Sequence, residues 1–410
     1  MNRIKKLLHE LNYLKAENIF QIFVFFISIL PSIVYTILVK VSRRKIWLIC
    51  EDKMEARDNG ICLFSYVNKH AKDVIAYYAI RFQSKDYPYV KSMGRVVRYG
   101  SVFHWMLYFA SQYTISTQKE GKPDAAIGYV LEQSGLLKQK FIFLQHGITL
   151  NRAEWLFYKN TKMRLYICGA EPEYRYVLEE FGYPENYVMY LGLCRFDSYF
   201  YHLDKVNKKQ MVLMPSWREW ISSKNEYSKV FEDTKDFRNT EYYQVYQSLI
   251  NNRKLIRFLK ENGITLFFYP HRNMQKYITL FSAPCRNIQI VSNETSDIRK
   301  LLIESAVMIT DYSSVALDFA YMKKPVIYYQ FDEERFRKAQ YKEGYFSYRQ
   351  SNLGTVFYNE EDVVEEVIRL FQTGFALDQS FYQAHQAFFP IWDNKNCERT
   401  YQAIKGLREL

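Results

Sequence analysis

The sequence lacks the short motifs that mark several common classes of phosphate-handling and hydrolytic enzymes. Its 410 residues contain no Asp-x-Asp, no G-x-x-x-x-G-K-[ST], no G-x-G-x-x-G and no G-x-S-x-G. The chain therefore has none of the usual signatures of P-loop phosphoryl transfer, dinucleotide redox chemistry or α/β-hydrolase catalysis. We expect any bound phosphate to be neutralised by backbone N–H groups, hydroxyls and arginines, without a metal ion and without a cofactor.

Paired cysteines are also missing. The six cysteines form no C-x-x-C pair, and three of them lie in or beside apolar runs typical of strands. They are Cys50, Cys62, Cys168, Cys194, Cys285 and Cys397. This spacing argues against a disulfide framework and against a zinc site, and it indicates buried or incidental thiols in a reducing compartment.

Positive charge exceeds negative charge. The chain has 56 Lys and Arg against 44 Asp and Glu, a formal net charge of +12. A basic surface favours an anionic partner, which could be a phosphorylated substrate, an acidic lipid or a nucleic acid. Because the chain has no zinc finger, no RNP-like aromatic motif and no long Lys/Arg block, we predict no nucleic-acid partner.

Only one long apolar segment is present, at residues 19–39. Its 21 residues could just span a bilayer, and basic residues on both sides leave its orientation open. Because Pro31 interrupts it, we predict that residues 1–44 form an anchor that dips into or lies on the cytoplasmic leaflet. The protein would then be peripheral or monotopic on the cytoplasmic face of the cell membrane. A single span is the alternative, and a buried core helix is disfavoured because nothing globular precedes the segment to pack against it.

After the anchor, apolar runs alternate with stretches of helical spacing. The predicted strands are 46–50, 74–80, 112–116, 141–145, 164–168 and 187–191 before a polar break at 201–210, and 211–214, 265–269, 288–291, 306–309, 325–329 and 355–358 after it. The predicted helices are 61–70, 172–181, 241–262, 296–304, 314–323 and 360–372. Such alternation is typical of α/β proteins with parallel sheets. We predict two Rossmann-like domains, 45–205 and 206–410, with a cleft between them.

The stretch from Thr310 to Ser314 joins a predicted strand to a predicted helix and is rich in hydroxyls. One interpretation is helix capping, for which one hydroxyl is enough. The other is a site for a phosphate-bearing ligand, built from Thr310, Ser313 and Ser314 with the free N–H groups of the helix. Asp318 follows one and a half turns later, where it could accept a hydrogen bond from a ligand hydroxyl or be a solvated helix carboxylate.

Two histidines follow predicted strands at equivalent points of the two halves. His146 precedes Gly147, which would let the backbone approach a ligand closely. His271 precedes Arg272 at the end of the strand at 265–269. Ligands of parallel sheets bind beyond the carboxyl ends of the strands, so the two histidines would face one another across the cleft. We therefore predict catalytic roles for both.

Further polar residues follow the strands nearest the predicted domain boundary. Arg195 and Asp197 come after the last strand of the first half, and Trp217 and Arg218 after the first strand of the second half. The arginines could clamp a phosphate in bidentate fashion. The alternative is a surface ion pair with Asp197 or with Glu219.

At these residues the sequence resembles the CDP-glycerol glycerophosphotransferase family, the teichoic-acid and capsule polymerases and primases of GT-B fold. The resemblance covers most of residues 45–400, and its most specific part is TDYSSVALDFAYMKKPVIYY, which begins at Thr310. Further matches are Glu51 with Asp58-Asn59-Gly60, His146-Gly147, Gly192 with Arg195 and Asp197, Pro215 with Trp217-Arg218, and His271. The family implies a lipid-linked acceptor and N-terminal attachment to the membrane surface.

The resemblance also implies roles for individual residues. His146 would be the general base on the acceptor hydroxyl, and His271 would steady the phosphate or the departing CMP. Ser313 and Ser314 would hold the donor pyrophosphate, and Asp318 would help bind the nucleoside or the polyol. From their places after the predicted strands we also predict Thr310 and Arg272 at the donor, and Gly147, Arg195, Asp197, Trp217 and Arg218 at the acceptor or its phosphate. The implied reaction is attack on the β-phosphorus of CDP-glycerol or CDP-ribitol, with release of CMP, in teichoic acid or capsule synthesis.

Two departures from the family pattern affect the acceptor. The family often has Trp-His-Gly-Thr-Pro-Leu-Lys where this chain has Gln145 to Asn151, so a lysine is missing, and its usual Gly-x-Ala-Ser tail is replaced at 394–397. Two other functions stay open. One is a GT-B glycosyltransferase that uses a CMP- or UDP-sugar, and the other is a non-catalytic, membrane-attached scaffold of a polysaccharide assembly complex.

Overall fold

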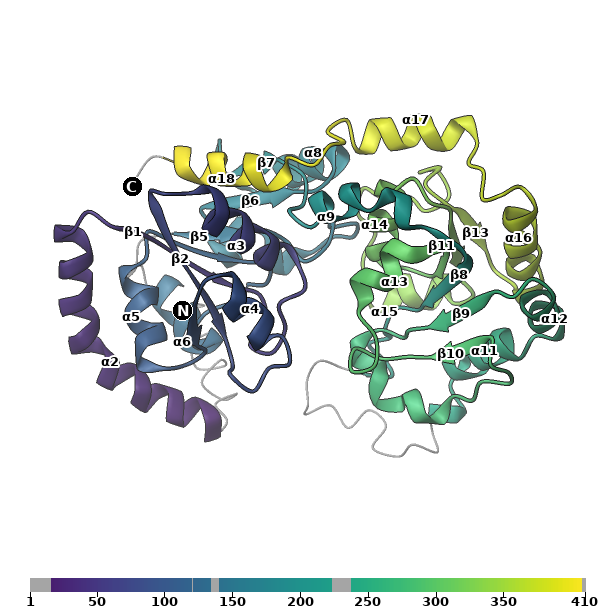
Figure 1. The fold of residues 1–410 in the computed structure, drawn as a ribbon, viewed down its shortest axis with the longest axis horizontal. Helices are drawn as coiled ribbons and strands as arrows, with labels where there is room; N and C mark the ends of the chain where they lie inside the picture. Colours follow the sequence, from purple (N-terminus) through teal and green to yellow (C-terminus); the bar gives the residue numbers. More distant parts are fainter. Residues whose placement is uncertain (1–15, 120, 134–139, 223–236, 408–410) are drawn as a thin grey trace.

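The computed structural model describes residues 16–119, 121–133, 140–222 and 237–407. They form two separate parallel sheets, each flanked by helices (Figure 1). The seven-stranded sheet has the order β3-β2-β1-β4-β5-β6-β7, and the six-stranded sheet has the order β10-β9-β8-β11-β12-β13. Both orders reverse direction once, between β1 and β4 and between β8 and β11, and these reversals are where parallel sheets bind ligands.

The strand bounds follow the apolar runs of the sequence. The first sheet contains β1 (Lys45–Cys50), β2 (Val74–Ile80), β3 (Arg95–Arg98), β4 (Tyr113–Ser116), β5 (Phe141–Phe143), β6 (Leu165–Cys168) and β7 (Val188–Tyr190). The second contains β8 (Asn207–Met214), β9 (Thr265–Phe268), β10 (Ile288–Ile290), β11 (Ser305–Thr310), β12 (Val326–Tyr329) and β13 (Thr355–Phe357). Every residue of β11 is buried, as expected for a central strand covered by helices on both faces.

Helices connect the strands and cover both faces. Those of the first half are α3 (Asn59–His70), α4 (Tyr87–Met93), α5 (Val102–Ala110), α6 (Ala125–Gln133), α7 (Tyr158–Thr161), α8 (Glu171–Glu180) and α9 (Phe196–Tyr201). Those of the second half are α11 (Glu241–Asn251), α12 (Arg253–Glu261), α13 (Ile298–Glu304), α14 (Val315–Tyr321), α15 (Glu333–Ala339), α16 (Glu360–Gln372), α17 (Gln379–Phe388) and α18 (Asn396–Gly406). Short 3₁₀ helices are η1 (Glu154–Leu156), η2 (Leu203–Lys205) and η3 (Arg272–Leu280).

The predicted α/β class and the GT-B arrangement of two Rossmann-like units are confirmed, and each of the twelve predicted strands has a counterpart. The sequence did not indicate β3, whose four residues include an arginine at each end. Charged residues are typical of an edge strand, and they hide its apolar centre. The predicted helix 241–262 is two helices, because the Asn252 side chain accepts the Leu255 N–H at 3.0 Å and starts α12.

The apolar N-terminal segment forms one helix, α2 (Ala16–Val41), which continues through Pro31 and bends (Figure 1). One side packs against α5, where the rings of Phe25 and Trp105 lie 5.1 Å apart. The segment therefore packs against a helix that follows it in the chain. Its other side is exposed and apolar and includes Ile19, Phe20, Phe23, Phe26, Ile27, Leu30, Ile33, Val34, Ile37, Leu38 and Val41. By length and composition alone, residues Ile19–Val41 could cross a membrane.

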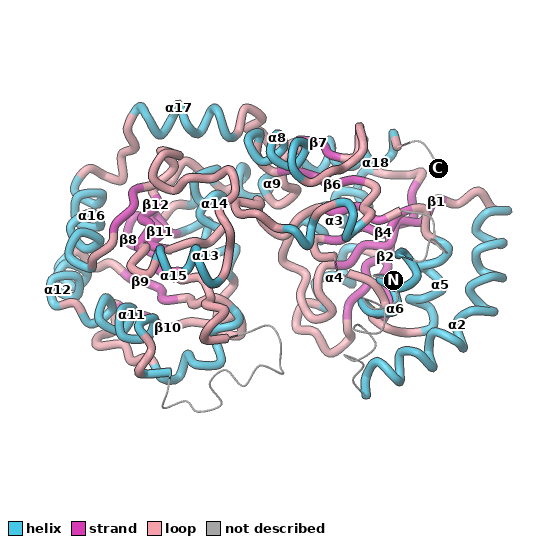
Figure 2. The backbone as a smooth tube through the Cα atoms, turned by 180° about the vertical axis from the view of Figure 1, so that it is seen from behind, coloured by secondary structure: helices cyan, strands magenta, loops and turns pink. Residues whose placement is uncertain are grey.

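The end of the chain returns to the first half. Helix α17 runs across the top of the molecule and α18 lies beside α3 (Figures 1 and 2). The rings of Tyr401 in α18 and Trp47 in β1 are 5.6 Å apart. The last helix thus belongs to the core of the first sheet. The division of the chain at 44 and 205 stays a prediction.

Candidate functional site

Loops from the carboxyl ends of both sheets meet between the two halves. Gly147 follows β5 and Ser314 follows β11, and a methyl group added to Gly147 would lie 2.7 Å from Ser314 Oγ. No side chain larger than hydrogen fits there unless Ser314 moves. The structure therefore brings together the predicted histidine loop of the first half and the predicted serine loop of the second.

His146 is held by an aspartate from another strand end. Its Nδ1 lies 2.5 Å from Asp58 Oδ2, while 74% of the His146 side chain remains exposed. Asp58 caps α3 and its Oδ1 accepts the Asn59 N–H at 2.8 Å. The Asp58 carboxylate raises the pKa of the His146 imidazole above its ordinary value. The ring is thus fixed at one nitrogen and open to a substrate.

Arg195 connects this pair to the second half. Its Nη1 donates to Asp58 Oδ1 at 2.7 Å and to the His146 carbonyl at 2.9 Å. Its Nε and Nη2 donate to the two carboxylate oxygens of Asp318, at 2.7 and 2.9 Å. Arg195 and Asp318 are buried. All described hydrogen bonds of this guanidinium thus join residues of the site. Because Asp318 lies in α14, the helix that follows Ser314, Arg195 fixes this helix to the histidine loop.

The backbone before His146 adopts a conformation that L-residues rarely take. Gln145 has a φ of 62°, in the left-handed region. Its side-chain amide donates to the Ile167 carbonyl at 2.9 Å and to Glu173 Oε1 at 2.8 Å. Glu173 also accepts the Thr149 N–H at 2.5 Å, and burial raises the pKa of Glu173 to about 7. This buried carboxyl therefore fixes both ends of the histidine loop.

A second buried carboxylate orders the loop between β1 and α3. Glu51 accepts the backbone N–H groups of Arg57, Asp58 and Ile61 at 2.8, 3.1 and 2.6 Å. Burial raises the pKa of Glu51 to about 8. A side chain at Gly60 would come within 2.8 Å of Glu51 Cγ, so the Gly leaves room for this carboxyl. Glu51 thereby sets the position of Asp58.

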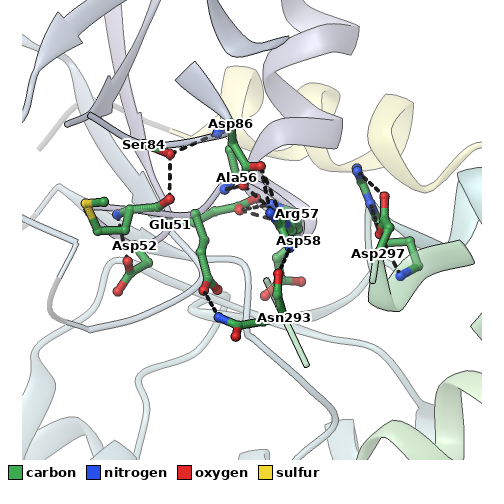
Figure 3. Close-up of polar contacts among 12 residues, drawn as sticks. Glu51, Asp52, Ala56, Arg57, Asp58, Ser84, Asp86, Asn293 and Asp297 are labelled. Atoms are coloured by element: carbon green, nitrogen blue, oxygen red, sulfur yellow. Dashed lines mark hydrogen bonds and ion pairs between the residues drawn. The ribbon is translucent and has the colours of Figure 1, made fainter. Parts of the chain in front are cut away.

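The same loop contacts the second half (Figure 3). Arg57 pairs with Asp86 at 2.9 Å and donates from Nη1 to the Asn293 carbonyl at 3.2 Å. Glu55 accepts from Asn293 Nδ2 at 3.3 Å and lies 3.4 Å from Arg272 Nη1. Arg272 is thus at the border of the two halves, and its role in binding the donor stays a prediction.

The serine loop and His271 occupy partly buried positions. Ser313 Oγ accepts the Val315 N–H at a long 3.4 Å, and the Ser314 side chain makes no capping hydrogen bond. Helix capping therefore does not account for the Ser314 hydroxyl. The His271 N–H donates to the Pro215 carbonyl at 3.0 Å, which fixes this residue beside the end of β8. That the two histidines face one another stays a prediction.

Several predicted ligand-binding residues make contacts within the protein. The Thr310 hydroxyl is buried and donates to the Met214 carbonyl at 2.6 Å. Asp197 accepts the N–H groups of Asn396 and Cys397, both at 2.8 Å, at the start of α18. These contacts support the fold of the site, and direct binding of a ligand by Thr310 or Asp197 stays a prediction.

Arg218 is fully buried next to the serine loop. It pairs with Asp311 at 2.9 Å and with Asp332 at 2.7 Å. Asp311 Oδ1 in turn accepts the Ser216 N–H at 2.8 Å. The alternative of a surface ion pair of Arg218 with Asp197 or Glu219 is wrong, because its partners are other carboxylates in the core. Neighbouring Trp217 is half-buried, with its ring 6.3 Å from that of His271.

Sequence reasoning gave no role to Asp58, Glu173 or Arg57. Asp58 was visible as part of a family match and as a helix-capping Asp before Asn59, but its partner His146 is 88 residues away. Within the four described ranges, no group of three or more His, Cys, Asp and Glu side chains could hold a metal ion.

Two parallel α/β units with a histidine loop against a serine loop define a protein of the GT-B class. The solved structure of the wall teichoic acid polymerase TagF has this fold, with a TM-score of 0.65 and 15% identity over 96% of this chain and 98% of that chain. At this identity the likeness concerns the fold alone. Another TagF structure, of a variant soaked with CDPG, has a TM-score of 0.60.

Sequence comparison identifies the family. The profile of the family described as CDP-Glycerol:Poly(glycerophosphate) glycerophosphotransferase matches residues 33–406. The chain belongs to this family of transferases, which confirms the resemblance of its motifs.

Two curated relatives come from teichoic acid synthesis. The minor teichoic acid biosynthesis protein GgaB of Bacillus subtilis is 32% identical over 385 residues, 93% of this chain and 42% of that protein. A teichoic acid glycerol-phosphate transferase of Staphylococcus aureus is 21% identical over 370 residues, 85% of this chain and 89% of that protein. The chain thus spans less than half the length of GgaB.

Proposed function

We propose that this chain transfers glycerol phosphate, or ribitol phosphate, from a CDP-polyol to a hydroxyl of a teichoic acid or lipid-linked saccharide, releasing CMP. The observation that carries this proposal is the exposed His146 imidazole. Asp58 holds it at 2.5 Å, and its neighbour Gly147 lies against the Ser314 hydroxyl. Membership of the glycerophosphotransferase family supports the same reaction. Teichoic acid or capsule synthesis at the cell wall is the proposed setting.

In the proposed reaction the acceptor oxygen attacks the β-phosphorus of the donor. A new P–O bond forms as the bond between this phosphorus and the CMP oxygen breaks, and the acceptor proton moves to Nε2 of His146. The Asp58 carboxylate at Nδ1 stabilises the imidazolium that results, as the acid of a catalytic triad does. General-base help of this kind typically contributes about 10²–10⁴-fold in rate.

The donor would lie along the second half. We assign its pyrophosphate to the Ser313 and Ser314 hydroxyls and to Arg272, with His271 at the departing CMP. Asp318 and Thr310 would position these groups, because their polar atoms are engaged inside the protein by Arg195 and by the Met214 carbonyl.

The acceptor would approach from the first half past Gly147 and reach Trp217 of the second half, with Arg195, Asp197 and Arg218 supporting the loops around it. We place the apolar outer side of α2 in the cytoplasmic leaflet of the cell membrane. Packing of the other side against α5 favours a helix that lies in the leaflet over one that spans it. The proposed domains are 1–44 for the anchor, 45–205 for the acceptor and 206–410 for the donor, with α18 at the end of the donor domain returning to pack on the first sheet.

The test is CMP release by detergent-solubilised protein with a membrane-lipid extract as acceptor. CDP-glycerol, CDP-ribitol and CMP-sialic acid are offered in turn to wild type, His146→Ala and Ser313→Ala/Ser314→Ala. We expect release from one CDP-polyol, with turnover of His146→Ala lower by about 10²–10⁴-fold. Turnover of the sugar nucleotide alone would instead identify a glycosyltransferase, and a protein inert with every donor would fit the scaffold.

A further inference from the structure

A cavity of about 750 Å³ lies at the carboxyl edge of the first sheet, next to the proposed membrane helix. Residues at or just after the ends of β1, β2, β3 and β4 line it, including Lys53, Arg81, Arg98 and Gln118. Phe20, Gln21 and Val24 of α2 also line it. The donor and acceptor sites proposed above use none of these residues.

The lining combines groups that suit a phosphorylated saccharide. Three basic residues, Lys53, Arg81 and Arg98, can donate charge-assisted hydrogen bonds to phosphate oxygens. Side-chain amides and carboxylates can pair with sugar hydroxyls as donors and acceptors; they belong to Gln21, Gln83, Gln118, Asp52 and Asp124. The rings of Phe20 and Tyr99 offer apolar faces on which a sugar can lie. A purely anionic or purely apolar ligand would use only part of this lining.

The wall formed by α2 places the cavity at the edge of the proposed membrane surface. Phe20 of the wall and its neighbours Ile19 and Phe23 expose more than 60% of their surface. Between them, Gln21 donates from Nε2 to the Gly100 carbonyl at 3.2 Å. The Gln21 Oε1 atom is buried without a hydrogen-bond partner among the residues that the structure describes. A polar atom in that state is a ready acceptor for a ligand hydroxyl.

A short chain of contacts connects the cavity to the proposed general base. Glu51 lines the cavity and accepts the Asp58 N–H at 3.1 Å. Asp58 in turn holds His146. Glu51 is therefore shared between the lining of the cavity and the contacts that position His146.

We propose that this cavity binds the saccharide-phosphate headgroup of a lipid-linked acceptor, with the lipid chain beside α2 in the membrane. The inference rests on the proposed transfer reaction, for which it names the acceptor class and its binding site. It also gives the basic residues at the ends of β1, β2 and β3 a function as phosphate ligands.

The test compares two arginines of the same strand. Lys53→Gln/Arg98→Gln removes two charges from the cavity, whereas Arg95→Gln removes one at the other end of β3, outside the lining. Both arginines are exposed, so neither variant should unfold the protein. The probe is a synthetic N-acetylhexosamine diphosphate ester of a short alkyl alcohol, and its Kd is measured by calorimetry. CDP-glycerol binding is measured in parallel.

We expect the double variant to raise the Kd for the probe about tenfold or more, because two charge-assisted hydrogen bonds are lost. Arg95→Gln should bind the probe as wild type does, and the Kd for CDP-glycerol should be the same in all three proteins. Unchanged probe binding by the double variant, in a wild type that releases CMP from CDP-glycerol, would overturn the inference alone. A wild type that binds the probe through Lys53 and Arg98 but releases no CMP would overturn the proposed function.

A competition experiment with phospholipid is the second part of the test, because a phospholipid headgroup also carries a phosphate. Phosphatidylglycerol micelles, and the alkyl diphosphate without its sugar, are tested as competitors of the probe. Weak competition by both supports a site for the sugar together with the phosphate. Competition by phosphatidylglycerol as strong as that of the probe itself would make the cavity a phospholipid site and overturn the acceptor assignment.

Discussion

Asp58 contacts His146 with one carboxylate oxygen and Arg195 with the other, at 2.5 and 2.7 Å. The single aspartate therefore orients the imidazole and ties it to the arginine that reaches Asp318 in the other half. Asp58→Asn keeps the size of the side chain but removes its charge. We expect kcat to fall by about 10²–10⁴-fold with little change in the KM for CDP-polyol, because the imidazolium loses its counter-charge.

The pH dependence of kcat distinguishes the loss of the counter-charge in Asp58→Asn from a general disturbance of the fold. Asp58 raises the pKa of His146, and the base must be neutral, so wild-type kcat rises with pH through that raised pKa. In Asp58→Asn the same rise should occur at lower pH. The control is Asp204→Asn at an exposed side chain, which should keep both the rate and the profile. A rise at the same pH in Asp58→Asn would contradict the assigned role of Asp58.

The strands and the serine loop could be predicted because their signals are local. A parallel strand covered on both faces is a continuous apolar run, and the stretch from Thr310 to Asp318 carries a specific family pattern. The ion pairs of the site could not be predicted from the sequence, because they join distant parts of the chain. Arg195 and Asp318 are 123 residues apart, and the choice among several carboxylates depends on how the two sheets are placed.

The burial of a side chain is the second property that the position of a residue in the sequence does not determine. An arginine just after a strand suits a phosphate clamp, and Arg218 has this position in the sequence. In the structure it is fully buried between Asp311 and Asp332. Rings from α11, α15 and the serine loop pack around its guanidinium, and the sequence around Arg218 does not show this packing.

Arg195 should be important for stability as well as for activity. Arg195→Ala leaves the buried carboxylates of Asp58 and Asp318 without their cation. Breaking a buried pair in this way typically costs about 3–5 kcal/mol in the free energy of unfolding. Denaturant unfolding measures the loss. Arg175→Ala, at an exposed ion pair with Glu171, is the matched control and should lose less than about 1 kcal/mol.

Glu173 should make stability depend on pH near neutrality. Burial raises its pKa from 4.5 in the unfolded chain to about 7 in the folded protein. Between these values the folded state binds the proton more strongly, so the free energy of unfolding falls as pH rises and levels off above about pH 7. The contribution of this one group is about 3 kcal/mol.

Glu173→Gln removes the titrating group while keeping its size. The unfolding free energy of wild type minus that of the variant should therefore fall as pH increases from 4.5 to 7. Denaturant titrations at several pH values measure it, and the difference cancels the contributions of Glu51 and other groups. A constant difference across this range would mean that Glu173 keeps its ordinary pKa when folded.

The outer side of α2 should determine membrane binding. Phe23 and Leu30 expose 63% and 71% of their surface, so Phe23→Lys/Leu30→Lys should leave the fold intact while placing two charges in the lipid. We expect the variant to stay in the supernatant when vesicles of zwitterionic phosphatidylcholine are sedimented, because these do not attract the added lysines. Leu178→Lys, at an exposed position of α8, should still sediment with the vesicles as wild type does.

The contact of Gly147 with Ser314 can be tested with a double-mutant cycle of Gly147→Ala and Ser314→Ala. A methyl group in Gly147→Ala would lie 2.7 Å from Ser314 Oγ and 3.5 Å from its Cβ, so the hydroxyl must move away from the proposed donor pyrophosphate. We expect the KM for CDP-polyol to rise about tenfold. Ser314→Ala removes the colliding atom, so adding Gly147→Ala to it should have little further effect. Steady-state kinetics of the four proteins give the coupling, which should be about 1 kcal/mol. Additive effects would mean that the two loops are apart when the enzyme works.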